Sequence, residues 1–390
     1  MMKKRGYIRP LALIAIACLL MLTACAGIKE RAGQLMIDAG LMAAPEITQV
    51  TLAVPVPLNP GKEYTQYIKG VELAVLEAAA MDLPVTLNIQ IDYDRGDFSS
   101  AIELTLAYIN DSSTIGVVGH WGSFICLPLA NIYAAEQKTL IASIASAPSL
   151  TSKLSDYIFR NIPQDGQVSE KMCDYAKRQG LQKAVVYYED SVYGFEMSAA
   201  LEQYAQSIGI EIVDRTCSPH LERDLPELER KWRAFGYDTV FLISTLEEGV
   251  ELINALRGLG FAGSIICSNG LDDEELIGYL DSGAQDLVVA STFNSERPPE
   301  GLAQFAQRYT EHYGTVPDSW AIQGYDSVMI VVEAVAKHGV RTSDELSAYL
   351  RASDNLGGIF GATYFDERHE IAGKPIYLKK LTGSRFEYID

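Results

Sequence analysis

A glycine-rich turn at residues 119–123 offers backbone and hydroxyl groups that suit the binding of a carboxylate. It reads GHWGS, and it follows the apolar run 115–118, which indicates a buried strand, while a helical pattern begins near Ser123. In open α/β sheets, ligands bind beyond the carboxyl ends of strands, close to helix N-termini. Unpaired N–H groups of a first helical turn attract anions. We expect Ser123 both to cap this helix and to face the ligand.

Motifs that are typical of enzymes do not occur in the sequence. There is no GxSxG elbow, no HExxH pair and no GxxxxGK[ST] phosphate loop. The five histidines are scattered, at positions 120, 220, 312, 338 and 369. The cysteines at positions 126, 173, 217 and 267 show no CxxC spacing, so we expect no metal site and no cofactor. A hydrolase is therefore only a remote alternative.

Strand-like and helix-like segments alternate through the first part of the chain. Short apolar or alternating runs predict strands at 50–54, 85–91, 115–118 and 139–144. Apolar residues at helical spacing predict helices at 64–80, at about 100–110, where Ser99 or Ser100 is the expected cap, and at 123–136. This alternation is typical of a parallel sheet with helices on both faces.

The same alternation restarts after Asp165. We expect helices at 167–179, 195–207, 226–234 and 247–259, and strands at 184–188, 211–213, 239–243, 264–267 and 287–290. Helices at 301–313, 320–337 and 342–351 and a strand at 375–380 complete the chain. Two successive units of this kind predict an α/β protein with two doubly wound, Rossmann-like lobes.

The N-terminus resembles a bacterial lipoprotein signal. Four basic residues within positions 3–9 precede the apolar run 11–22, which is shorter than the roughly 20 residues that span a membrane. The run ends in LTAC, with Cys25 as the residue that would take the lipid. We therefore expect a signal peptide at 1–24 and a tether at 25–46, which would anchor an exported protein to a membrane that it does not span. An ordinary signal peptide with a chance cysteine is the alternative.

The charge of the chain argues against nucleic acid as a partner. The net charge is −19, and removal of the basic residues 1–24 makes it −23. A strongly acidic surface repels phosphate backbones.

The hydrophobic content of the chain suits a protein with two domains. With 48% hydrophobic residues, the chain can bury the cores of two domains. We expect a monomer.

Several short motifs follow one another in an order that resembles a known family. They are Phe159-Arg160, Pro163-Gln164-Asp165, Tyr193-Gly194, Gly324-Tyr325-Asp326-Ser327 and Phe365-Asp366. From about residue 47 to 390, their order and spacing are similar to those of type I periplasmic solute-binding proteins, in particular the leucine/isoleucine/valine-binding receptors of ABC transporters. The resemblance implies that the chain crosses between two lobes three times.

The resemblance also implies the extent of each lobe. Lobe one would comprise residues 47–163 and 293–365, and lobe two residues 165–291 and 366–390. Closure of the two lobes about these crossings would capture a ligand without unfolding either core.

Further ligand-binding residues follow from the resemblance. Ser146 would give a second carboxylate contact, and Asp165 would lie near a ligand amine, where a charge-assisted hydrogen bond is strong. Tyr193 would pack its ring on the ligand. Trp121 and Tyr64 lie on loops of lobe one and would form an aromatic wall. Each of these residues also has an ordinary structural alternative, as a turn serine, a helix cap or a core aromatic.

Residue 269 departs from the family pattern. Amino-acid receptors of the family carry an acid in the loop that reads Ser268-Asn269-Gly270 here. Asn269 can donate and accept hydrogen bonds but supplies no charge. The ligand could thus be an amino acid, an amide or a carboxylate, and Asp272 is a candidate replacement for the missing acid.

Together with the lipoprotein signal, the resemblance therefore implies a substrate-binding lipoprotein that presents a small polar solute to an ABC permease. The alternative is a sensory or scaffolding lipoprotein that keeps the fold without transport, which the change at Asn269 makes credible.

Overall fold

The computed structural model describes residues 47–57, 62–152, 155–218, 220–273, 275–281 and 285–389 of the chain. Residues 49–390 cluster into one unit. None of the helices in the described ranges is both long and apolar enough to cross a membrane. The predicted signal peptide at 1–24, the lipid site Cys25 and the tether at 25–46 lie outside the described residues.

The first sheet has five parallel strands in the order β2-β1-β3-β4-β5. The strands are β1 (Gln49–Val56), β2 (Thr86–Tyr93), β3 (Thr114–Val118), β4 (Leu140–Ala142) and β5 (Ile158–Arg160). The helices between them are α2 (Lys62–Ala79), α3 (Phe98–Asn110) and α4 (Ser123–Ala135). β3 is buried along its whole length, whereas the edge strand β2 is partly exposed. Continuous burial is expected for a central parallel strand with helices on both faces.

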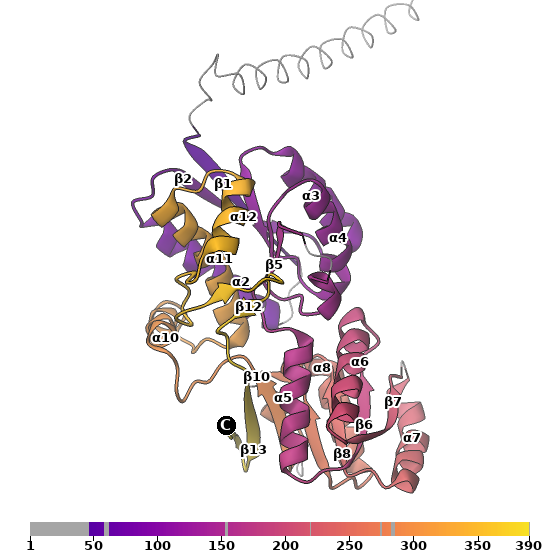
Figure 1. Cartoon of the computed structure of the whole chain (residues 1–390). Coiled ribbons are helices and arrows are strands. Elements are labelled where there is room, and N and C mark those ends of the chain that lie inside the picture. The colour runs from indigo at the N-terminus through magenta and orange to yellow at the C-terminus, as the bar shows by residue number, and fades with distance from the viewer. Residues whose placement is uncertain are drawn as a thin grey trace, which may run out of the picture. The chain divides into compact units, whose positions relative to one another are not determined.

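Three helices from the second half of the chain return to the first sheet. They are α10 (Glu300–Tyr313), α11 (Ser319–His338) and α12 (Ser343–Ala352). Figure 1 shows α11, in orange, beside α2. Two glycines permit this close contact, because a Cβ at Gly70 would lie 2.0 Å from the carbonyl oxygen of Ala321, and one at Gly324 would lie 2.4 Å from that of Tyr67. The glycines thus let the first turns of α11 pack directly against α2.

The second sheet has seven strands in the order β14-β13-β10-β9-β8-β6-β7. The strands are β6 (Lys183–Tyr188), β7 (Glu211–Thr216), β8 (Thr239–Ile243), β9 (Ser264–Cys267), β10 (Leu287–Ser291), β13 (Tyr377–Thr382) and β14 (Arg385–Tyr388). The last two are antiparallel additions to a parallel sheet. The helices of this group are α5 (Asp165–Arg178), α6 (Val192–Ser207), α7 (Leu221–Phe235), α8 (Leu246–Gly258) and α9 (Leu276–Tyr279).

Hydrophobic clusters cover both faces of the second sheet. Leu242 and Trp232 belong to the cluster beneath α7 and α8, whereas Phe241 and Met172 belong to the cluster beneath α5 and α6. Consecutive strand residues point to opposite faces, so Phe241 and Leu242 serve different cores. These two helix-covered sheets confirm the predicted α/β class with two doubly wound lobes.

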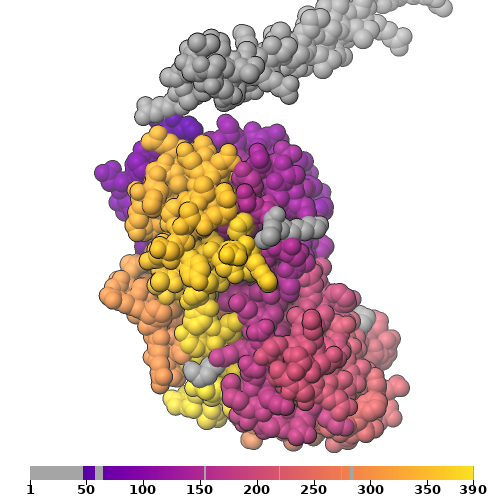
Figure 2. Space-filling view, in the orientation of Figure 1, coloured from indigo at the N-terminus to yellow at the C-terminus, as the bar shows by residue number. Residues whose placement is uncertain are grey.

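The chain passes between the two groups of elements three times. The connecting segments are residues 161–164, 292–299 and 373–376. In the space-filling view, the C-terminal residues, in yellow, continue from the neighbourhood of the purple residues to that of the magenta ones (Figure 2).

The segment just before the third passage packs on the first group. β11 (Tyr364–Phe365) pairs with β12 (Ile371–Ala372), and the Arg160 N–H donates to the carbonyl oxygen of His369 at 3.0 Å. The guanidinium Nε of Arg160 also donates to Glu370 at 2.7 Å. Residues 366–372 are therefore bound to the end of β5.

Several details differ from the sequence predictions. Asp97, and not Ser99 or Ser100, caps α3, since its carboxylate accepts from the Ser100 N–H at 2.8 Å. Ser123 is not the N-cap of α4: that residue is Gly122, and Ser123 is the first helical residue. The strand β14 was not predicted, because its residues are polar and partly exposed.

The cysteines of the described chain are free thiols. Cys126, Cys173 and Cys267 are buried, and Cys217 is partly exposed. His120 is buried too, with Nδ1 3.3 Å from Asp94 and Nε2 3.0 Å from the Tyr133 hydroxyl. Burial lowers the pKa of His120 although Asp94 favours its charged form. These contacts of His120 stabilise the turn that follows β3.

Candidate ligand-binding site

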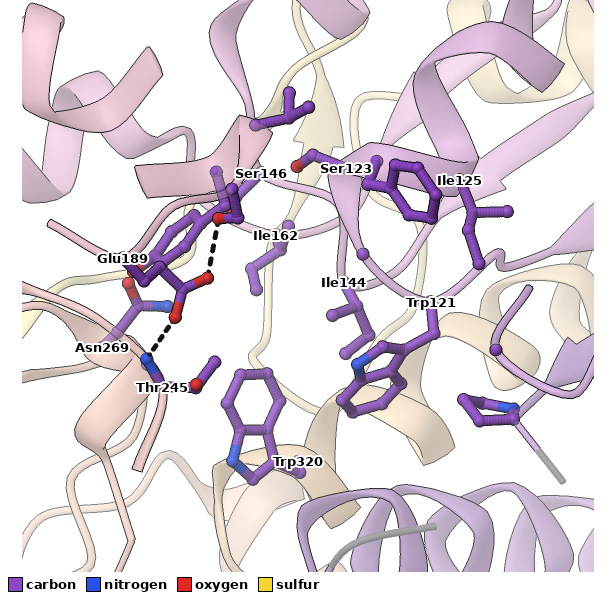
Figure 3. Close-up of a pocket in the computed structure, with 18 residues that line it drawn as sticks. Trp121, Ser123, Ile125, Ile144, Ser146, Ile162, Glu189, Thr245, Asn269 and Trp320 are labelled. Carbon is purple, nitrogen blue, oxygen red and sulfur yellow. Dashed lines mark hydrogen bonds between the residues drawn. The ribbon is translucent and has the colours of Figure 1, made fainter. Parts of the chain in front are cut away.

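A cavity of 280 Å³ lies where the carboxyl ends of strands from the two sheets face each other. Its lining comes from segments that follow all five strands of the first sheet and the strands β6, β8 and β9 of the second, and from the start of α11 (Figure 3). The residues from the first group are Pro57, Gly96, Trp121, Gly122, Ser123, Phe124, Ile125, Ile144, Ser146, Ile162 and Trp320. Those from the second group are Glu189, Ser191, Val192, Tyr193, Thr245, Asn269 and Gly270. A volume near the lower end of the roughly 300–1,000 Å³ of ligand sites suits a small solute.

The start of α4 supplies hydrogen-bond donors to the cavity. Its N-cap, Gly122, has a φ of 76°, which favours glycine, and it has no side chain to satisfy the N–H groups of the first turn. The Ser123 hydroxyl lines the cavity and accepts a hydrogen bond from the Ala147 N–H at 3.3 Å. An accepting hydroxyl keeps its own proton available for a ligand. The positive end of the helix dipole and these donors together suit a carboxylate.

The loop that carries Ser146 is held by a fully buried arginine. Nη1 of Arg160 donates to the carbonyl oxygens of Ser146, at 2.9 Å, and Ala147. Nη2 reaches the Thr151 hydroxyl at 2.9 Å, and Glu370 neutralises the guanidinium. Since Arg160 uses its donors on both the loop and Glu370, it fixes the loop from behind and leaves the Ser146 side chain in the cavity lining.

Asp165 lies next to the cavity but does not line it. It is the first residue of α5, whose N-cap is Gln164, and its N–H donates to the Ser146 carbonyl at 3.2 Å. The side chain is fully buried, and neither carboxylate oxygen has a hydrogen-bond partner. Burial raises the pKa of Asp165 to about 7, although Ser146 and Arg160 act in the opposite direction.

Tyr193 lines the cavity from the start of α6. Its hydroxyl donates to Oγ of Ser268 at 2.9 Å. Burial, with Asp165 as the next cause, holds the pKa of Tyr193 well above its usual value, so the ring stays neutral. Gly270 is required beside it, because a Cβ there would lie 2.3 Å from the Ser244 carbonyl oxygen. The ring is thus held in place with its polar end satisfied.

Asn269 contributes an amide to the lining. It lies in a short 3-10 turn after β9, it is buried, and its Oδ1 has no hydrogen-bond partner. A buried acceptor without a partner is costly unless a donor reaches it. Asp272, the candidate replacement for an acid at 269, is instead paired with Lys379 at 2.7 Å and does not line the cavity.

Glu189 is a lining residue that the sequence reasoning missed. Its Oε1 accepts from the Ser191 hydroxyl at 2.7 Å, and its Oε2 accepts from the Thr245 N–H at 2.8 Å (Figure 3). It directly follows β6, so the rule on strand ends that selected Ser123 could have found it.

Two tryptophans form an aromatic wall on the first-group side. The rings of Trp121 and Trp320 have centroids 5.7 Å apart at 47°, and Tyr67 meets Trp121 edge-on at 5.3 Å. Sequence reasoning selected Trp121 but not Trp320, which lies 199 positions later and reaches the site through the packing of α11 on α2. Tyr64 belongs to α2, but its side chain lies outside the described part of the structure.

Most of the chain is similar to known proteins. The family model described as "Periplasmic binding protein" matches residues 65–385. An ABC transporter substrate-binding protein from Desulfitobacterium hafniense, solved in complex with Leu, is 30% identical, with a TM-score of 0.78 over 87% of this chain and all of that one.

Two further relatives are more distant. "Leu/Ile/Val-binding protein homolog 3" of Brucella melitensis is 21% identical over 80% of this chain and 84% of its own length. A solute-binding protein of an ABC transporter from R. palustris, solved with benzoate, is 18% identical, with a TM-score of 0.75 over 87% of this chain and 95% of that one.

Proposed function

This chain belongs to the periplasmic binding protein family, and on that premise we propose that it is the substrate-binding protein of an ABC transporter and captures an amino acid between two lobes. The relatives named Leu/Ile/Val-binding proteins and the neighbour solved with Leu support an amino-acid ligand. These relatives are substrate-binding proteins, which agrees with the expectation that the chain is not an enzyme.

One observation carries this proposal: a single cavity joins anion-binding and cation-binding groups from opposite sides. The uncapped start of α4, with Ser123 and Ser146, faces the cavity from the first group. Glu189, Tyr193 and Asn269 face it from the second group. A ligand that contacts both sides stabilises the closed arrangement, because only the closed form offers all contacts at once.

We divide the chain into lobe one, residues 47–163 with 293–365, and lobe two, residues 165–291 with 366–390. The hydrogen bonds of residues 366–374 with the end of β5 and with α11 favour a third crossing closer to residue 375. In particular, the buried ammonium of Lys374 lies 2.7 Å from Asp326 on α11. Three short crossings permit bending between lobes whose cores stay intact.

The proposal includes export and a lipid anchor at Cys25. Its support is the basic start, the apolar run 11–22 and the LTAC sequence that ends at Cys25. The protein would then face the periplasm or the cell exterior as a monomer, tethered close to its permease.

Thermal unfolding of the purified mature chain tests the function. Any solute that binds the native state raises the melting temperature, by an amount equivalent to about 2.7 kcal/mol at a hundredfold excess over Kd. We expect a rise with at least one α-amino acid in a panel that also contains amides and carboxylates. A folded protein that no small solute stabilises, yet that retains a protein partner in a pull-down, would favour the scaffolding alternative instead.

A further inference from the structure

We infer that Glu189 binds the ammonium group of the ligand and thereby replaces the acid that Asn269 lacks. This inference rests on the proposed function and narrows it: the ligand carries a positive group beside its carboxylate, and plain carboxylates and amides are poor ligands. The charge, position and hydrogen bonding of Glu189 each support this assignment.

The first observation is the charge of the cavity. Glu189 is the only charged side chain among the described lining residues, and no lysine, arginine or histidine lies among them. A second acid, Glu248, lies close enough that the charge of Glu189 helps, after burial, to raise the pKa of Glu248. A carboxylate alone would be repelled from this side of the cavity, whereas an ammonium would be attracted.

The second observation is position. Glu189 lies in lobe two at the end of β6, and the donors at the start of α4 lie in lobe one, yet both line one cavity. The two ends of an α-amino acid would thus contact opposite lobes. Its ammonium would meet Glu189 and its carboxylate would meet the turn at Ser123, so that one zwitterion would draw the lobes together.

The third observation is the remaining hydrogen-bonding capacity of Glu189. A carboxylate has about four acceptor positions. Glu189 uses two of them, for the Ser191 hydroxyl and the Thr245 N–H. These donors orient the carboxylate, and each oxygen can still accept a hydrogen bond from an ammonium. Preorganisation of this kind favours strong, charge-assisted hydrogen bonds.

Asn269 completes the site in a secondary role. Its buried Oδ1 lacks a partner and can accept a second hydrogen of the ammonium. Asp165, which the family resemblance places near the amine, is fully buried and absent from the lining. Glu189 is therefore the acid that a ligand in this cavity reaches directly.

The apolar wall of the cavity determines which ligand side chains can bind. Trp121 and Trp320 face the cavity together with Ile144 and Ile162. Such a wall suits a large apolar side chain, as in leucine or phenylalanine. An acidic side chain would find no cation among the described residues of this wall.

Matched ligand pairs test the inference in the wild-type protein. Calorimetric titration would compare L-leucine with 4-methylpentanoate and L-phenylalanine with 3-phenylpropionate, which differ only by the ammonium group. We expect the amino acid of the pair that binds to be at least about tenfold tighter than its deaminated analogue. Equal or tighter binding of the analogue would overturn the inference while leaving a transport receptor intact.

Variants then assign the effect to Glu189. Glu189→Gln should weaken the binding of the amino acid by about 10- to 100-fold and leave the binding of the deaminated analogue unchanged or tighter. The matched control is Glu247→Gln, an exposed acid at the start of α8 outside the cavity, which should change neither. Unchanged amino-acid affinity in Glu189→Gln would contradict the assignment.

A rescue experiment separates lost charge from lost folding. In the double variant Glu189→Gln with Asn269→Asp, the acid returns to the loop position from which it is missing. We expect the double variant to bind the amino acid at least about tenfold more tightly than Glu189→Gln does, because both positions line the same cavity. If the single variant is folded, as judged by its melting temperature, and the double variant binds the amino acid no better, Glu189 does not act through its charge.

If the wild type binds no amino acid at all, the proposed function fails, and the inference fails with it.

Discussion

Asp165 is a buried acid whose environment disfavours its charge. Its carboxylate oxygens have no hydrogen-bond partner, and burial raises its pKa from 3.8 to about 7. In the unfolded chain the side chain ionises at the ordinary value, so the native state holds the proton more tightly. The higher pKa of Asp165 in the native state therefore contributes to the free energy of unfolding at low pH. This contribution is fully present below about pH 4, and it is lost as the pH rises through about 7.

We predict that Asp165→Asn is more stable than the wild type at pH 8 and equally stable near pH 4. The difference at pH 8 should reach at most about 4 kcal/mol, the free energy that corresponds to a rise from 3.8 to about 7. Urea unfolding at several pH values measures it. Asp190→Asn, at an exposed position after β6, is the control and should show no such trend. A difference between the Asp165 variant and the wild type that does not change with pH would contradict the prediction.

At the residue scale, the sequence located much of the cavity lining. Ser123, Ser146, Tyr193 and Asn269 follow the ends of strands, and the structure brings all of them to one cavity. Glu189 obeys the same rule but was missed, because the reasoning looked for an acid at the position of Asn269. Whether these residues bind a ligand remains a prediction.

At the element scale, helix contacts decide what the local sequence cannot. Trp320 reaches the cavity because α11 packs closely on α2 through Gly70 and Gly324. Local periodicity predicted both helices but not which neighbours they would have. Capping was equally hard to predict: Asp97 and Ser100 both suit the cap of α3, and only the observed hydrogen bond from the Ser100 N–H to Asp97 decides between them.

We predict that Gly324→Ala separates α11 from α2. Its new Cβ would lie 2.4 Å from the Tyr67 carbonyl oxygen, which is backbone and cannot move aside alone. Overpacking of this kind costs about 1–3 kcal/mol in the free energy of unfolding. Because Trp320 lies in the first turn of the same helix, binding of an amino acid should weaken as well.

The control for this change is Gly278→Ala, where a Cβ would meet nothing within 4 Å. Alanine should be tolerated there, since it favours helix over glycine. Denaturant unfolding of both variants, with calorimetric titration of L-leucine and L-phenylalanine, checks the pair. Equal stability of the two variants would show that the α2–α11 contact is looser than described.

At the scale of the whole molecule, the order of motifs predicted two lobes because each lobe repeats one strand–helix pattern. Where the third crossing lies could not be read from the sequence, since the contacts of residues 366–374 with β5 and α11 join positions about 50 to 210 apart. Long-range ion pairs such as Arg160–Glu370 produce no periodic pattern in the amino-acid sequence, so periodicity could not predict them.

The lipid anchor is a second property of the whole molecule. We predict that Cys25→Ser, expressed from the full chain, moves the protein from the membrane fraction to the soluble fraction, because the lipid and not an apolar helix would hold it. Fractionation and mass spectrometry of the N-terminus measure this. A variant that stays in the membrane fraction, or a wild type without a lipid mass, would contradict the anchor.

The central claim is that one amino acid binds in the cavity between the two lobes. Isothermal titration of the purified mature chain with L-leucine and L-phenylalanine tests it most directly. The account predicts saturable binding of at least one of them with one site per chain, lost or strongly weakened in Glu189→Gln and retained in Glu247→Gln. A folded protein that binds neither amino acid, or that binds them equally well without Glu189, would contradict it.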